Sequence, residues 1–308
     1  MILPASETRK MAREALQGKW GKSALIILIY LAISLVIGLL SAIPILGFLV
    51  MIGEFVIMIP ISFGLGMTFL KLKRNQEVGY VDFLTDGFKN FSRAWCVTGR
   101  LLLKMIVPII LYIVGFVIMT ISAVSSLVGA VSLSSSVTGT SLVFMFISII
   151  LIAVAAGFFI VLGLKYALSV YIAIDNPDMP AADCVNKSGE LMDGNSGKLF
   201  CLTLSFIGWF LLASILPAIF SAIGIDFLYT LAFLAAEVFL LPYIYMAIVV
   251  FYENIAEISN SSTVETAGNV TTEENTNGIQ EKSGSQDVKA EIVDIPELEK
   301  KPNEDNNE

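Results

Sequence analysis

Histidine is absent from this 308-residue chain, and cysteine occurs only three times. Without histidine the chain lacks the commonest general base and the commonest metal ligand. Cys96, Cys184 and Cys201 are odd in number and widely spaced, which predicts neither a disulfide framework nor a zinc site. We therefore expect three reduced thiols and no metal or cofactor.

Charged residues are also scarce, at 15% of the chain, where soluble domains carry about 25%. The stretch from Met105 to Leu164 contains no Asp, Glu, Lys or Arg at all. It is long enough for two membrane crossings, since each needs about 20 apolar residues. The composition therefore predicts a polytopic membrane protein.

Apolar runs predict six membrane spans, which lie at residues 24–43, 45–70, 105–128, 142–165, 199–223 and 227–252. Each should be helical, because backbone groups in hydrocarbon must bond within their own segment. The expected fold is all-α, with three hairpins turning at Pro44, Ser132–Ser141 and Gly224–Asp226. A cleaved signal peptide is the alternative for the first span, but its apolar run is too long for a typical signal core.

Basic residues mark one side of the predicted bundle. They precede the first span and follow the second and fourth, whereas the three opposite turns hold no Lys or Arg. The positive-inside rule then places both termini in the cytoplasm. We expect a cytoplasmic amphipathic segment at 1–22, a membrane domain at 23–256, and a tail at 257–308. The tail carries 4 basic and 13 acidic residues and should be disordered and cytoplasmic.

The connections at 75–104 and 175–198 belong to the predicted membrane domain. In the first, aromatic and other apolar residues recur at three- and four-residue steps, as on one stripe of a helix: Tyr80, Phe83, Leu84, Phe88, Phe91 and Trp95. Lys89, Arg93 and Arg100 occupy other faces. This pattern fits a helix in the lipid headgroup layer or, equally, one packed on the end of the bundle. The expected interfacial anchors are Phe88 and Trp95 on this stripe, Trp20 on a similar face of the N-terminal segment, and Lys165, which can reach the headgroups from the end of the fourth span.

An internal repeat links two short segments, since residues 14–22 and 190–198 both read E-x-x-x-G-x-x-G-K and run into a span. Glycine at Gly18 and Gly194 would let a surface helix end before the chain enters the membrane. Small residues follow at four-residue spacing, such as Ser34, Gly38 and Ala42, which predicts close helix contact.

Glu54 and Glu237 are the most unusual residues, because both fall within predicted spans at similar depth. One interpretation is an intramembrane polar site that binds a cation, a proton or a cationic substrate. The other is that each carboxyl is protonated or bonded to a neighbouring group. Asp175, Asp178 and Asp183 cluster after the fourth span, where we expect them to cap a helix rather than to bind metal.

Three segments carry a resemblance to a known family: Arg9-Ala12-Leu16-Gly18-Trp20, Asp82-Phe83-Leu84 with Gly87-Phe88 and Arg93-Ala94, and Ser188 to Trp209. With them the chain resembles a family of bacterial integral membrane proteins, the domain of unknown function nine-seven-five. The resemblance covers about residues 1–256. It implies a multi-pass protein of the bacterial plasma membrane, distantly similar to the membrane region of glycerophosphodiester phosphodiesterases, and it assigns no functional residue.

Two classes of function remain open. The first is a non-enzymatic factor that organises membrane lipid or binds a protein partner through its interfacial helices or tail. The second is a transporter of an ion or small solute that uses Glu54 and Glu237. An enzyme is not expected, because no nucleophile is paired with a base, and nothing indicates nucleic acid as a partner.

Overall fold

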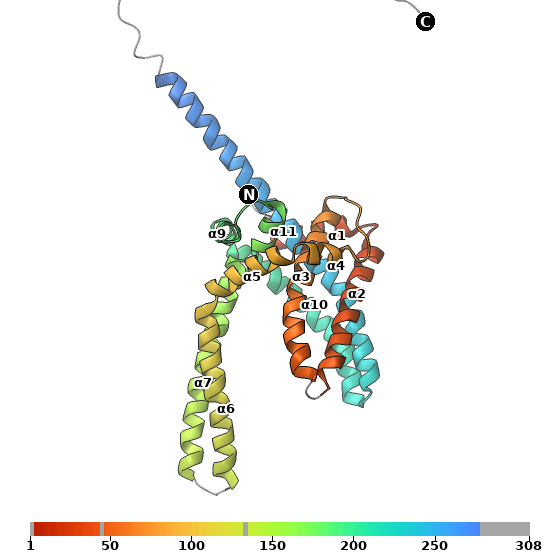
Figure 1. Ribbon diagram of the computed structural model, residues 1–308, viewed down its shortest axis with the longest axis vertical. Helices are drawn as coiled ribbons and strands as arrows, with labels where there is room; N and C mark the ends of the chain where they lie inside the picture. Colours follow the sequence, from red (N-terminus) through yellow and green to blue (C-terminus); the bar gives the residue numbers. More distant parts are fainter. Residues whose placement is uncertain (1–2, 44–45, 132–134, 278–308) are drawn as a thin grey trace, which may run out of the picture. The chain divides into compact units, whose positions relative to one another are not determined.

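The computed structural model describes residues 3–43, 46–131 and 135–277 (Figure 1). All regular secondary structure in this part of the chain is helical, and six helices are long and apolar enough to cross a membrane. They are α2 (Trp20–Ser41), α3 (Leu46–Lys73), α6 (Ile106–Val131), α7 (Ser135–Lys165), α10 (Ser196–Ile223) and α11 (Asp226–Asn277). The prediction of an all-α polytopic membrane protein is confirmed.

The bounds of these helices agree with the predicted spans except at two places. α7 begins at Ser135, so the turn predicted at 132–141 is wrong from that residue on. Serine and threonine are only mildly unfavourable in helices, and packing between α6 and α7 overrides that preference. Pro44 and residues 132–134 lie outside the described residues. α11 continues to Asn277, and the rest of the predicted tail is likewise not described.

Consecutive spans pair as hairpins. α2 packs against α3, and α6 packs against α7 along the hairpin drawn in yellow and yellow-green in Figure 1. α10 ends at Gly224, whose left-handed φ of 79° reverses the chain into α11. Residues from α10 and α11 line a common cavity, which shows that this pair also lies side by side.

Five shorter helices form a group that we call the collar: α1 (Ala5–Leu16), α4 (Asp82–Lys89), α5 (Phe91–Lys104), α8 (Ser169–Asp175) and α9 (Ala181–Leu191). Each of these helices packs against a span or another collar helix, as in the pairs α1 with α10, α3 with α4, and α5 with α9. The single helical stripe predicted across 75–104 is interrupted at Asn90, where α4 ends and α5 begins after one residue.

The two repeated segments have the same local structure. Gly18 lies between α1 and α2 with φ 73°, and Gly194 lies between α9 and α10 with φ 70°. Both are left-handed conformations that glycine adopts without a steric penalty. The motif predicted from the sequence thus marks the point at which a collar helix ends and a span begins.

The buried core is concentrated at the collar and the adjoining ends of the spans. It includes Phe69 of α3, Phe83 of α4, Ile172 of α8 and Phe251 of α11. The remainder of each span exposes large apolar side chains to the surroundings, and Leu127 of α6 is one example. Water would not tolerate so much contiguous apolar surface, whereas lipid covers it without penalty.

Two glycines permit a close crossing between the span α3 and the collar helix α4. A Cβ added at Gly64 of α3 would overlap the carbonyl oxygen of Phe83, and one at Gly87 of α4 would overlap that of Pro60. The backbones of α3 and α4 are therefore in direct contact. This crossing fixes the position of α4, and through it that of α5, relative to the first hairpin.

Candidate functional site

The two intramembrane glutamates occupy different surroundings. Glu237 is half-buried and lines a cavity of 500 Å³ formed by residues of α10 and α11. Glu54 is half-buried on α3 and forms no part of that cavity. Neither carboxyl makes a hydrogen bond or an ion pair within the described part of the chain. The shared polar site therefore stays a prediction.

A second cavity, of 340 Å³, lies where helices of all three hairpins meet. Its lining includes the side chains of Thr98, Tyr171, Thr203 and Tyr245, and no charged residue belongs to it. A cavity of this kind offers hydroxyl groups to a ligand and no counter-charge to an ion.

The four predicted anchors lie at the ends of spans or in the collar. Trp20 begins α2, and its ring lies 6.4 Å from that of Tyr243. Phe88 is 48% exposed at the end of α4. Lys165 ends α7 as predicted, and its backbone carbonyl accepts a hydrogen bond from Ser188 of α9 at 3.2 Å. Anchoring in lipid stays a prediction for all of them.

Trp95 has a role that the sequence pattern did not reveal. Pro60 has no N–H group, so the carbonyl of Val56, four residues earlier, loses its partner in the α3 helix. The indole Nε1 of Trp95 donates a hydrogen bond to that carbonyl at 3.3 Å. Its ring also meets Phe55 edge-on at 5.6 Å. Trp95 thus repairs the proline-interrupted helix and attaches α5 to the first hairpin.

An ion-pair cluster connects the three hairpins. Arg74, directly after α3, bonds both carboxyl oxygens of Asp175 on α8 at 2.7 Å and an oxygen of Glu253 on α11 at 3.0 Å. Tyr252 donates a further hydrogen bond to Asp175 at 2.8 Å. The hydrogen bond to Asp175 raises the pKa of Arg74 above its ordinary value. Asp175 therefore bonds an arginine of another hairpin, rather than capping a helix as the sequence suggested.

Arg93 attaches α5 to the segment between α8 and α9. Its Nε donates to the carbonyl of Ala173 at 2.9 Å, and its Nη2 donates to the carbonyls of Asn176 and Met179. One arginine thus bonds a carbonyl near the end of α8 and two carbonyls of the irregular connection that follows, which contains two prolines. The sequence placed Arg93 off the aromatic face but gave no indication of this role.

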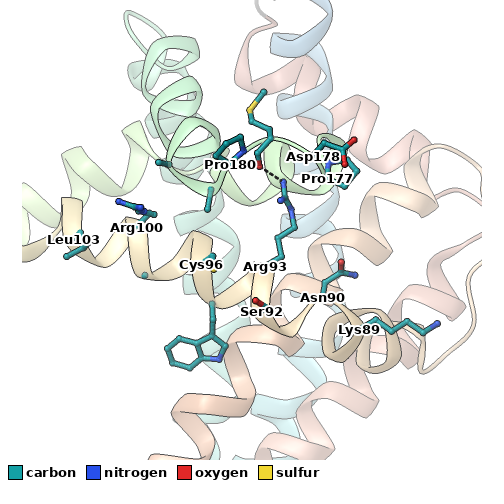
Figure 2. A pocket seen from close by; sticks show the side chains of 15 residues that line it. Lys89, Asn90, Ser92, Arg93, Cys96, Arg100, Leu103, Pro177, Asp178 and Pro180 are labelled. Atoms are coloured by element: carbon teal, nitrogen blue, oxygen red, sulfur yellow. Dashed lines mark hydrogen bonds between the residues drawn. The ribbon is translucent and has the colours of Figure 1, made fainter.

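A groove of 840 Å³ runs beside this arginine, between α5 and residues 177–182 at the start of α9 (Figure 2). Arg93, Cys96, Arg100 and Leu103 line it, and their spacing places them on one face of α5. Figure 2 shows Arg93 reaching from α5 toward the segment that carries Pro180.

Positive charge exceeds negative charge in this groove. Lys89, Arg93 and Arg100 line it, and Asp178 is the acidic residue of the lining. Lys89 and Arg100 are exposed, and neither makes a hydrogen bond or an ion pair among the residues that the structure describes. Two cations thus remain available to an anionic ligand.

The three cysteines differ in accessibility. Cys184 is buried, and its desolvation raises the pKa of its thiol. Cys96, on the groove, and Cys201, on α10, are both exposed. In the described part of the chain no group of three or more Cys, Asp or Glu side chains is arranged to hold a metal ion.

The fold defines a multi-pass, all-α membrane protein with a helical collar. A family model described as "Protein of unknown function (DUF975)" matches residues 1–259, and the chain belongs to this family. No curated protein and no solved structure matches the chain. The similarity to glycerophosphodiester phosphodiesterases thus stays a prediction.

Proposed function

We propose that this protein is a non-enzymatic membrane-organising factor that binds anionic lipid through its collar. The observation that carries the proposal is the groove beside α5, at the end of a membrane span, where two exposed cations have no partner within residues 3–43, 46–131 and 135–277. Unpaired cations next to apolar surface match the chemistry of a lipid headgroup and its acyl chains.

Charge asymmetry supports an orientation for this function. Of the fifteen basic residues in residues 1–256, ten lie in the collar helices or the connections, and the other five lie in the first or last turn of a span. By the positive-inside rule, the collar and both termini face the cytoplasm of a bacterial plasma membrane. Anionic lipids attract basic segments at that surface with about 1 kcal/mol for each Lys or Arg.

The transport alternative requires a cavity that reaches both Glu54 and Glu237. The cavity that Glu237 lines is formed by α10 and α11, and the hydroxyl-lined cavity where the hairpins meet contains neither glutamate. No observation therefore favours transport over lipid binding. The absence of histidine from the sequence likewise offers no support for an enzyme.

Reconstitution of the full chain tests the proposal. We would place it in nanodiscs of phosphatidylcholine alone or with phosphatidylglycerol, and measure the midpoint temperature of thermal unfolding. A ligand that binds the folded state raises this midpoint. We expect a rise of a few degrees with phosphatidylglycerol, which becomes smaller at high salt as the charges are screened. Equal midpoints in the two lipids would contradict the proposed function.

A further inference from the structure

We propose that the groove between α5 and the start of α9 binds the phosphate of one anionic phospholipid, with Lys89 and Arg100 as its ligands. This inference rests on the proposed function and deepens it, because it names one site and one headgroup chemistry. Three features carry it: the depth of the groove in the membrane, its charge, and its continuity with apolar surface.

Chain connectivity fixes the depth of the groove. α5 ends at Lys104, and the candidate span of α6 begins at Ile106. The groove residues Arg100 and Leu103 therefore lie within two turns of the start of a span. The start of a span lies at the membrane surface, so this end of the groove lies at the level of the headgroups.

The charges of the groove favour a phosphate. Backbone carbonyls hold Arg93 in the wall of the groove, whereas Lys89 and Arg100 are exposed and make no ion pair with any residue that the structure describes. Asp178 is the carboxylate in the lining, and Asp183 is exposed on α9 outside it. Cations outnumber the lining carboxylate by three to one, so the field favours an anion.

Apolar continuity distinguishes a lipid from free phosphate. Leu103 lines the groove and is 61% exposed, and the neighbouring Leu102 and Ile106 are also exposed. This surface leads from the cationic groove toward the α6 span, where acyl chains would lie. The volume of 840 Å³ falls within the range of about 300–1,000 Å³ that is usual for small-molecule sites.

Cys96 supplies a direct reporter, because it is exposed and lines the same groove. A Cys201→Ser background removes the other exposed thiol, and Cys184 is buried with a raised pKa. The experiment measures the rate at which a maleimide labels Cys96 in the full chain. The nanodiscs contain phosphatidylcholine with increasing fractions of phosphatidylglycerol.

We expect phosphatidylglycerol to slow the labelling of Cys96 several-fold. Each charge removed from the site should raise, by about 5-fold, the fraction of phosphatidylglycerol at which the labelling of Cys96 falls to half its rate. The variant Lys89→Gln/Arg100→Gln should thus lose protection across the accessible range. The variant Lys10→Gln/Lys104→Gln removes the same charge from exposed positions outside the lining, and it should stay protected. It also controls for the general effect of an anionic surface on thiol ionisation.

Three outcomes would overturn the inference. Protection equal in both double variants would show that lipid binds the collar without this groove, and the proposed function would survive. Protection of Cys96 by glycerol 3-phosphate in pure phosphatidylcholine would make free phosphate the ligand. No protection of the parent chain, together with a thermal midpoint that phosphatidylglycerol does not change, would remove both the groove and the proposed function.

Discussion

At the scale of single residues, the carbonyl of Val56 shows how this protein accommodates proline within a span. An unpaired carbonyl in hydrocarbon is unfavourable by several kcal/mol, because no water is present to bond it. Trp95 supplies the missing donor from a separate helix. The hydrogen bond between Trp95 and Val56 thus replaces the one that Pro60 cannot make, and it also joins α3 to α5.

Replacement of Trp95 by phenylalanine should destabilise the folded protein by about 1–3 kcal/mol, because a partly buried carbonyl within a span loses its donor. Phenylalanine retains most of the ring contact with Phe55. The measurement is the midpoint of thermal unfolding in detergent, where each kcal/mol corresponds to about 2–4 °C for a domain of this size.

The same substitution in a Pro60→Ala background is the control. Alanine restores an N–H group that can bond Val56 within the helix, so Trp95→Phe should then have a smaller effect. An equal loss of stability in the two backgrounds would show that the hydrogen bond contributes nothing and that only packing of the ring matters.

At the scale of helices, the contact between α3 and α4 depends on the absence of two side chains. Gly64 and Gly87 each face a backbone carbonyl of the other helix. A clash with backbone cannot be relieved by a change of rotamer, so the helices themselves must separate. The positions of α4 and α5, and hence one wall of the groove, depend on this crossing.

We predict that Gly64→Ala or Gly87→Ala destabilises the protein by about 1–3 kcal/mol or more, as overpacking does elsewhere. Gly157→Ala in α7 is the matched control, since no atom lies within 4 Å of its added Cβ. It should be neutral or stabilising by up to about 1 kcal/mol, because alanine is the better helix former. The measurement is the yield of monodisperse protein that each variant gives after gel filtration. Similar yields for all three variants would refute the close crossing.

Sequence patterns predicted some of these helical features and missed others. Gly18 and Gly194 were predicted from a local motif, because a helix end depends on residues close in the chain. The close contact predicted at Gly38 is wrong, since nothing in the described structure lies within 4 Å of its Cβ position. Spacing indicates which residues share a face, but only the fold determines what that face meets.

At the scale of the whole molecule, hydropathy predicted the six spans, because lipid imposes a length and a composition on each of them. Hydropathy does not predict the contacts between residues of the collar. Arg74 and Asp175 lie 101 residues apart, and neither spacing nor composition pairs one carboxylate with one arginine. The sequence did not predict the groove for the same reason, because the two walls of the groove come from separate connections.

The Arg74 cluster joins segments next to all three hairpins, since Arg74 directly follows α3, Asp175 lies on α8 after the second hairpin, and Tyr252 and Glu253 lie on α11. Isolated surface ion pairs contribute little, but a bidentate arginine shared by two carboxylates restrains several elements at once. We therefore expect this cluster to hold the hairpins in register at the collar end, where the core is also concentrated.

A double-mutant cycle tests that role. Arg74→Gln and Asp175→Asn should each lower the unfolding midpoint, and the pair should show a coupling of about 0.5–3 kcal/mol. The expected coupling lies toward the lower end, because the side chain of Arg74 is 39% exposed and water screens its charge. Lys10→Gln, at an exposed residue that forms no ion pair within the described part of the chain, should leave the midpoint unchanged. Additive effects of the two substitutions would mean that the interaction between Arg74 and Asp175 contributes nothing to stability. Apolar packing would then hold the hairpins together.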